Sequence, residues 1–364
     1  MANEPASGEM ASIARVLSAL LRAMHSLGFV GRHLDPERLG EVLGAIGEPD
    51  DVLRAALTEF DAQDMGPGDA FGPVRAQVTR AAEAILAGFD GVRASAAAMD
   101  LRGAYRALRR EAVALEALYP LAAILAPVDG FFLDEAARSD TALRARLAEP
   151  GEHCGIMHSA NGTGERGGFS LFVPESYRPE VAHPLVVALH GGSGHGRAFL
   201  WNWVRTARSL GVIVACPTAV GQTWALSGPD MDSPHLSRII DFVRARWNVD
   251  TDRLLLTGMS DGGTFTLLSG LQADSPFTHL APFATGFHPL LAEMADATRV
   301  RGLPIYLTHG ALDWMFPVEL ARTAQRMLGH VGAVVTYREI PDLAHVYPRE
   351  ENAAVVRWLV GAGG

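Results

Sequence analysis

A Gly-x-Ser-x-Gly pentad, Gly258-Met259-Ser260-Asp261-Gly262, lies within the otherwise apolar run LLLTGMSDGGTFTLL at residues 254–268. A serine held in such a turn can act as the nucleophile of an acyl-transfer reaction. The pentad alone is modest support, because a 364-residue chain with 38 glycines would hold on the order of 0.2 such pentads by chance. Whether Ser260 does chemistry therefore depends on its surroundings.

The residues around Ser260 fit a strand, a tight turn and a helix. RLLLTG (253–258) is apolar enough for a buried strand, and DGGTFTLLSGL continues as a helix. A nucleophilic serine needs this context because it must stand on a strained turn at the edge of a sheet. Gly258, Gly262 and Gly263 leave room where backbones crowd, and Asp261 places a negative charge in the first helical turn. The alternative is a Gly-rich turn with an incidental serine.

Serine is a poor nucleophile unless a base removes its proton, so a histidine and an orienting carboxylate are expected further along the chain. In this arrangement both follow later strands, in the order serine, acid, histidine. LPIYLTHGALDWMFP carries Asp313 after one predicted strand, and VVTYREIPDLAHVYP carries His345 after the next. Ser260, Asp313 and His345 are therefore the predicted catalytic triad.

Other acidic and imidazole side chains fit these two places less well. Asp274 and Asp296 lie away from strand ends, and Asp342 stands close before His345, where it is expected to shape the loop. A lone histidine is more often structural than catalytic, and His309 is expected to pack at a strand end. The other histidines considered as the base are His288 and His330.

Acyl transfer also needs donors for the negative oxygen that develops in the transition state. One predicted donor is the backbone N–H of Asp261, and another lies in the loop after an earlier strand. LVVALHGGSGHGRAF supplies that loop, with Gly192 as the favoured donor and Ser193 as the next candidate. The loop lacks the Gly-Lys-Ser/Thr ending of a P-loop, and no dinucleotide-binding fingerprint occurs, so no cofactor is expected.

Four aromatic side chains near these residues are candidates for a substrate pocket. Ordinary packing is at least as good an interpretation for each of them taken singly. Several aromatic rings near one mouth would suit an acyl or aryl ester of modest size. The candidate substrate-binding residues are these four aromatic residues, Trp224, Trp314, Phe316 and Tyr347, together with Ser193 of the glycine-rich loop.

The elements that must position these residues alternate in type along the second part of the chain. Uniformly apolar strands are typical of a sheet buried on both faces, and alternation with helices predicts a mostly parallel, doubly wound α/β sheet. In such a sheet the chemistry collects beyond the carboxyl ends of the strands. The expected strands span 169–174, 185–190, 212–218, 253–258, 281–286, 303–310 and 334–340, and the expected helices about 197–210, 233–247, 261–272, 317–329 and 349–361.

Residues 1–150 have helical periodicity instead. One apolar stripe is formed by Ile13, Val16, Leu17, Leu20, Leu21, Met24 and Leu27. Further helices are expected at about 35–46, 49–62, 71–88, 92–118 and 132–147. The sequence thus predicts an all-helical N-terminal domain (1–150) before an α/β domain (151–364). It leaves open whether the helical domain is a cap, a docking module or a surface for homo-oligomerisation.

Composition argues against several classes of partner. A net charge of −10 and a pI near 5.7, without a basic cluster, argue against nucleic acid and anionic membranes. Glu4 and Glu9 stand where a secretory signal is positively charged, and no run is expected to reach the about 18 apolar residues of a membrane helix. Cys154 and Cys216 form no metal or disulfide pattern. The prediction is a cytoplasmic protein with no metal site and no membrane partner.

From about residue 152 onward the sequence resembles serine esterases of the α/β-hydrolase superfamily. The group is that of phospholipase/carboxylesterase, feruloyl esterase and polyhydroxybutyrate-depolymerase-like proteins. The resemblance is carried by FSLFVPESY, HPLVVALHGG, GMSDGG, THGALDWMFP and DLAHVYP. It implies a Ser260–Asp313–His345 triad, with the amides of Gly192 and Asp261 as the oxyanion hole.

Three hypotheses on function follow. The first is a serine hydrolase that cleaves small-molecule carboxylic esters through an acyl-enzyme. The second is an acylaminoacyl- or prolyl-type serine peptidase, and the third is a non-catalytic binding protein that has kept the fold. Ester and amide forms of one acyl group would separate the first two, and labelling of Ser260 by a fluorophosphonate would separate both from the third.

Overall fold

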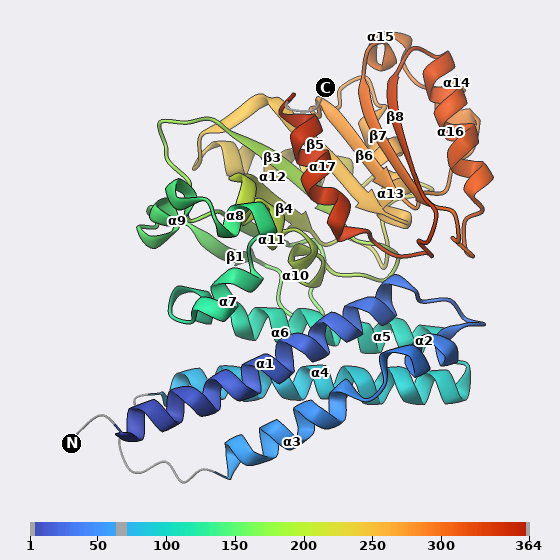
Figure 1. Ribbon diagram of the computed structural model, residues 1–364. Helices are drawn as coiled ribbons and strands as arrows, with labels where there is room; N and C mark the ends of the chain where they lie inside the picture. Colours follow the sequence, from blue (N-terminus) through green and yellow to red (C-terminus); the bar gives the residue numbers. More distant parts are fainter. Residues whose placement is uncertain (1–3, 63–70, 362–364) are drawn as a thin grey trace. The chain divides into compact units, whose positions relative to one another are not determined.

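The computed structural model describes residues 4–62 and 71–361 (Figure 1). The chain divides into two compact units, Met1–Phe132 and Leu133–Gly364. Helices α8 (Glu135–Arg138) and α9 (Thr141–Ala148) therefore belong to the second unit. The predicted boundary at residue 150 lies beyond these two helices.

The first unit is helical throughout the part that the structure describes. Helix α1 packs on α3 and α4, and α4 packs on α5 and α6. The helix predicted at 92–118 is interrupted, because Met99 ends α4 with a left-handed φ of 52° and the Asp100 side chain caps α5. The elements are α1 (Glu4–Arg32), α2 (Leu39–Ile46), α3 (Pro49–Asp61), α4 (Gly72–Ala98), α5 (Leu101–Leu108), α6 (Arg110–Leu118), η1 (Tyr119–Ala123) and α7 (Ala126–Phe131).

Helix α1 corrects one expectation from the sequence. Residues Glu9–Arg32 are long and apolar enough, by length and composition alone, to cross a membrane. The apolar stripe predicted along this helix is buried in the helical unit, with Ile13, Leu20 and Leu27 almost fully covered. Packing against α3 and α4 therefore accounts for the apolar residues of α1, as in the core helix of a bundle.

The second unit is built on one eight-stranded sheet with the order β1-β2-β4-β3-β5-β6-β7-β8. Strands β3 to β8 are parallel to one another, while β2 is antiparallel to both β1 and β4. All seven predicted strands are present, and β1 is added at the edge. The strands are β1 (Gly155–Ser159), β2 (Phe169–Val173), β3 (His183–Leu189), β4 (Ile213–Pro217), β5 (Val249–Met259), β6 (His279–Phe283), β7 (Pro304–Gly310) and β8 (Val334–Ile340).

Helices cover both faces of this sheet, which confirms the predicted doubly wound α/β architecture. Helix α11 lies beside α17 on one face (Figure 1), and α12, α13 and α16 contribute to a single apolar core with alternate residues of β3, β5 and β7. Such two-sided burial explains why β3 and β4 are apolar at nearly every position. The helices are α10 (Gly196–Phe199), η2 (Leu200–Asn202), α11 (Val204–Leu210), α12 (Ser233–Arg244), α13 (Asp261–Gly270), α14 (Leu290–Glu293), α15 (Ala297–Val300), α16 (Val318–His330), η3 (Arg349–Glu351) and α17 (Asn352–Leu359).

Candidate active site

Ser260 occupies the single residue between β5 and α13. Its backbone has φ 56° and ψ −120°, a region that non-glycine residues rarely adopt. The neighbouring glycines make this turn feasible. A Cβ atom at Gly258 would collide with the backbone of Gly262, and one at Gly262 would lie 2.5 Å from the carbonyl oxygen of His190. The Ser260 N–H donates to the carbonyl of Phe283 at the end of β6, which fixes the turn against the next strand.

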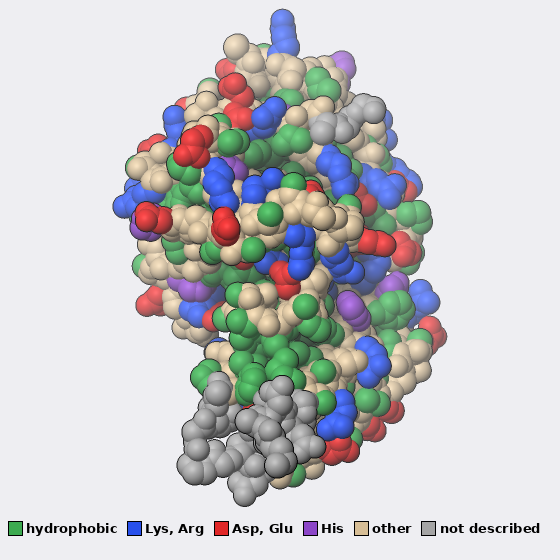
Figure 2. All heavy atoms as spheres, turned by 60° about the vertical axis from the view of Figure 1, so that its left-hand side comes forward, with side chains coloured by type: hydrophobic (Ala, Val, Ile, Leu, Met, Phe, Trp, Pro, Cys, Tyr) green, Lys and Arg blue, Asp and Glu red, His purple; other side chains and the backbone are tan. Residues whose placement is uncertain are grey.

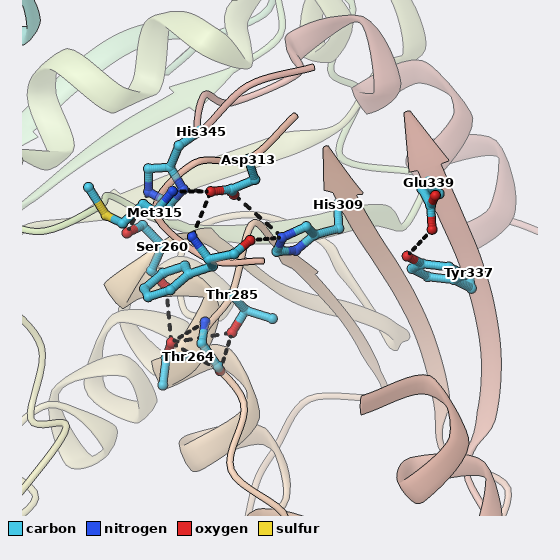
Figure 3. Close-up of polar contacts among 11 residues, drawn as sticks. Ser260, Thr264, Thr285, His309, Asp313, Met315, Tyr337, Glu339 and His345 are labelled. Carbon is cyan, nitrogen blue, oxygen red and sulfur yellow. Dashed lines mark hydrogen bonds and ion pairs between the residues drawn. The ribbon is translucent and has the colours of Figure 1, made fainter. Parts of the chain in front are cut away.

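The structure brings Ser260, His345 and Asp313 into one hydrogen-bonded line (Figure 3). The His345 Nε2 atom lies 3.1 Å from Ser260 Oγ, and Nδ1 lies 2.8 Å from Asp313 Oδ2. Because a carboxylate accepts the Nδ1–H proton, the lone pair of Nε2 faces the serine hydroxyl. His345 is thus set to receive the Ser260 proton, which is the arrangement a general base requires.

The Asp313 carboxylate is oriented by its own loop. Its Oδ1 atom accepts hydrogen bonds from the backbone N–H groups of Met315 (2.9 Å) and Phe316 (2.8 Å), which leaves Oδ2 for His345. The Asp313 side chain is fully buried. Buried in this way, the carboxylate interacts with His345 more strongly than it would in water. Asp313 follows β7 and His345 follows the adjacent β8, so both loops begin at the same edge of the sheet as Ser260.

The loop after β3 runs beside the serine. A side chain at Gly191 would approach the Cβ atom of Ser260 to 3.6 Å, and one at Gly192 would approach Asp261 Oδ2 to 2.8 Å. Asp261 opens α13, where backbone N–H groups of the first turn have no acceptor within the helix. Gly192 and Asp261 therefore lie beside Ser260, and their service as the oxyanion hole stays a prediction. Ser193 is exposed at the tip of this loop with φ 53°.

Comparison with known proteins finds similarity over part of the chain. Residues 230–360 match the model of the phospholipase/carboxylesterase family. In this part of its sequence the chain is similar to that family of α/β hydrolases. It is 31% identical over 147 residues to the bifunctional acetylxylan esterase/xylanase XynS20E of Neocallimastix patriciarum, an alignment that covers 39% of this chain and 21% of that protein. It is 26% identical over 176 residues to the uncharacterized protein YfhR of Salmonella typhi, covering 40% of this chain and 60% of that protein.

Among solved structures, the chain is similar in fold to several esterases. A thermostable esterase superposes with a TM-score of 0.46 at 21% identity, over 60% of this chain and 64% of the other. A ferulic acid esterase superposes with a TM-score of 0.48 at 14% identity, over 57% of this chain and 97% of the other. The chain spans about a fifth of the length of its first curated relative and 60% of the second.

His190 and Trp224 hold the loop after β3, residues 190–195, in place. The His190 Nδ1–H donates to the carbonyl of Gly191 at 2.7 Å, and Nε2 accepts the N–H of Ala219 at 3.1 Å. The Trp224 indole N–H donates to the His190 carbonyl at 2.7 Å, and its ring stacks on Phe265. Trp224 was predicted to contact substrate, but it is only 2% exposed and its N–H is already used. It supports the loop from the core, where a substrate does not reach.

Three of the predicted aromatic residues lie close to His345 in sequence or space, with different surroundings. Trp314 and Phe316 flank the imidazole edge-on, at ring distances of 6.1 and 5.3 Å, and both remain partly exposed. Tyr347 instead packs against Phe199, and burial raises the pKa of its hydroxyl well above the ordinary value. That hydroxyl donates to Asn352 at 2.7 Å. Trp314 and Phe316 therefore stay predicted substrate contacts, whereas Tyr347 holds the loop to α17.

The sequence predicts only turns at residues 160–168, yet Arg166 in this segment holds the loop after β3 in place. The Arg166 guanidinium donates to three backbone carbonyls, those of Gly194 (2.7 Å), Gly221 (2.8 Å) and Gln222 (3.2 Å). It thereby ties the loop after β3 to the loop after β4. No sequence motif predicts such a contact, because every residue has a backbone carbonyl and the carbonyls bound by Arg166 lie far away along the chain.

The loop after β3 also carries His195, whose titration should affect the stability of the folded chain. His195 caps α10, with Nδ1 accepting the N–H of Arg197 at 3.2 Å and Nε2–H donating to the Glu165 carbonyl at 2.9 Å. Burial lowers the pKa of His195 in the folded chain. Below the ordinary pKa of about 6.5, the unfolded chain therefore binds more protons at His195 than the folded chain does. The resulting contribution to stability is present above about pH 6.5 and is lost as the pH falls toward the folded pKa.

We therefore expect a His195→Asn variant to lose less thermal stability on acidification than the unchanged protein. The asparagine oxygen retains the helix cap but does not titrate. The measurement is the unfolding midpoint at about pH 7.5 and about pH 5.5, on either side of the ordinary histidine pKa. His235 and His279, whose pKa values burial also lowers, contribute equally in both proteins. An equal loss in the two proteins would contradict the expected role of His195.

Charged side chains of both signs lie on the surface of the molecule. Figure 2 shows acidic and basic side chains interspersed over the face that it displays. Among the residues that the structure describes, no three His, Cys, Asp or Glu side chains gather closely enough to hold a metal ion.

Proposed function

We propose that the protein is a serine esterase that hydrolyses carboxylic esters through an acyl-enzyme. The observation that carries this proposal is the line from Ser260 Oγ through His345 to the buried Asp313 carboxylate. The similarity of residues 230–360 to the phospholipase/carboxylesterase family supports hydrolysis in general, and the geometry of the three side chains supports a serine mechanism in particular.

In the proposed first half-reaction Ser260 Oγ attacks the ester carbonyl carbon while His345 Nε2 takes the hydroxyl proton. Asp313 remains ionised and stabilises the imidazolium that forms. The amides of Gly192 and Asp261 donate to the oxyanion of the tetrahedral intermediate. When the C–O bond to the leaving group breaks, His345 returns its proton to the departing alkoxide, and an alcohol leaves.

The second half-reaction repeats these steps with water. His345 removes a proton from the attacking water, the same two amides stabilise the second oxyanion, and the proton passes to Ser260 Oγ as the carboxylic acid leaves. Trp314 and Phe316 beside the imidazole, together with the exposed Met315, give the site an apolar margin. Such a margin suits an acyl or aryl ester of modest size.

Labelling with a fluorophosphonate probe tests the nucleophile directly. We expect the folded protein to be labelled at Ser260, with the site mapped by mass spectrometry of the peptide that spans β5 and α13, and we expect no labelling after heat denaturation. Failure of the folded protein to react would favour a non-catalytic binding protein. A panel that compares a p-nitrophenyl ester with the p-nitroanilide of the same acyl group separates an esterase, which prefers the ester, from a peptidase that cleaves both.

A further inference from the structure

A second histidine, His309, lies next to the triad without belonging to it. It is the penultimate residue of β7, it is fully buried, and its side chain points toward the Asp313 loop (Figure 3). Its Nε2 atom lies 2.8 Å from the carbonyl oxygen of Phe316 and 3.5 Å from Asp313 Oδ2. Glu339, its partner across β8, is the other ionisable neighbour on an adjoining strand. His309 thus contacts the loop that holds the catalytic carboxylate.

The hydrogen bonds define where the proton of His309 resides. A carbonyl can only accept, so Nε2 carries the hydrogen that it donates to Phe316. The distance to Asp313 is too long for a good hydrogen bond and leaves an electrostatic contact. The Nδ1 atom is buried and has no hydrogen-bond partner among the residues that the structure describes. A proton there would be an N–H without an acceptor, so the geometry selects the tautomer with hydrogen on Nε2 alone.

A buried polar atom without a partner is costly, and its presence here calls for a compensating role. The backbone of Phe316 suggests one. Its carbonyl accepts from His309 while its N–H donates to Asp313 Oδ1, so a single peptide segment is held from both sides. The Phe316 ring also lies edge-on against His345 at 5.3 Å. Moving Phe316 would therefore disturb both the carboxylate and the imidazole.

We propose that His309 is a positioning residue of the active site, which fixes the Asp313 carboxylate and the Phe316 ring through its hydrogen bond to the Phe316 carbonyl. The inference rests on the proposed esterase function for its kinetic consequences. Its structural consequence, the strength of the hydrogen bond between Asp313 and His345, is independent of that function. The two consequences are tested separately.

The test compares His309→Leu, which removes the donor, with His309→Gln, whose side-chain amide can still donate to the Phe316 carbonyl. His330→Leu, at the exposed end of α16, is the matched control for loss of an imidazole. We expect His309→Leu to lower kcat for a p-nitrophenyl ester by about tenfold to a hundredfold, because small displacements of catalytic groups have effects of this size. KM should change by less than about twofold, since uniform binding is not removed.

Two readouts separate positioning from a merely structural role. A loosened carboxylate stabilises the imidazolium less, so the ascending limb of the pH profile of kcat/KM should move to lower pH in His309→Leu. The low-field NMR resonance of the His345 Nδ1–H, assigned by its loss in His345→Gln, should broaden or shift upfield. Both should return toward the unchanged protein in His309→Gln. The resonance reports on the bond even if no ester is turned over, so failure of the esterase proposal would be seen separately.

Retention of kcat within about twofold in His309→Leu, with an unaltered resonance, would overturn the proposal. So would an equal loss in His309→Gln and His309→Leu. If His309→Leu does not fold, as judged by thermal unfolding, His309→Gln is compared with His309→Asn, whose shorter amide does not reach the Phe316 carbonyl. Lower kcat and a perturbed resonance in the asparagine variant alone support positioning, whereas equal behaviour of the two amides contradicts it.

Discussion

Replacing Ser260 with alanine is expected to lower kcat for a short p-nitrophenyl ester on the order of 10⁶-fold, close to the loss found when the nucleophile of a serine hydrolase is removed. The variant lacks only the Oγ atom, which is the attacking group. The backbone N–H that donates to Phe283 and the Cβ atom both remain, so the strained turn should persist. Turnover, fluorophosphonate labelling and thermal unfolding are measured on the same sample.

Ser237→Ala provides the control for the Ser260 experiment. Ser237 is exposed on α12, and its hydroxyl bonds only within its own helix, to the Ser233 carbonyl. Its replacement should leave turnover and the unfolding midpoint nearly unchanged, as is usual at the surface. The serine mechanism would be refuted if Ser260→Ala unfolded like the unchanged protein and still hydrolysed the ester at a comparable rate.

Replacing Asp313 with asparagine is expected to lower kcat by about 10⁴-fold, the size of the effect when the orienting acid of a triad becomes an amide. The two backbone donors at Oδ1, from Met315 and Phe316, should retain the amide oxygen at that position. The amide nitrogen would then face His345 Nδ1 and donate to it. His345 would carry its proton on Nε2, where it cannot accept the proton of Ser260.

Asp342→Asn is the matched control, because Asp342 is an exposed carboxylate close to His345 in sequence. We expect this change to alter kcat far less than Asp313→Asn, since the structure places Asp313 and not Asp342 against the imidazole. A larger loss in Asp342→Asn would reassign the acid. The His345 Nδ1–H resonance offers a second measurement, because it should disappear from its low-field position in Asp313→Asn only.

The loop after β3 shows most clearly what the sequence could and could not predict. The glycines of that loop and its place after an apolar strand were readable, because a close approach of backbones restricts the residue types locally. The contacts that hold the loop were not. Arg166 reaches Gly194 and Gln222 through side-chain bonds to carbonyls, which any residue type provides. Trp224 was assigned to the pocket as an aromatic residue near the predicted site. The sequence does not show which side of the loop a residue occupies, and the structure places Trp224 in the core.

The division of the chain follows the same logic. Helical periodicity predicted the apolar stripe of α1 and the helices around it, since each turn of a helix repeats its pattern locally. It did not show that α8 and α9 belong with the α/β unit, because that depends on which surface their apolar residues cover. The role of the helical unit as a cap, a docking module or an oligomerisation surface stays a prediction.

The sequence by itself determined most of the strands and helices, the strand–turn–helix at Ser260 and the order in which an acid and a histidine follow later strands. These features are local, since each is specified by residues within one strand, turn or helix. Only the tertiary structure decided that the strands before Ser260, Asp313 and His345 lie close enough for these three side chains to meet. It alone also showed that His309 contacts the Asp313 loop through the Phe316 carbonyl. Strand order and buried hydrogen bonds join residues far apart in the chain, and no local pattern encodes such distances.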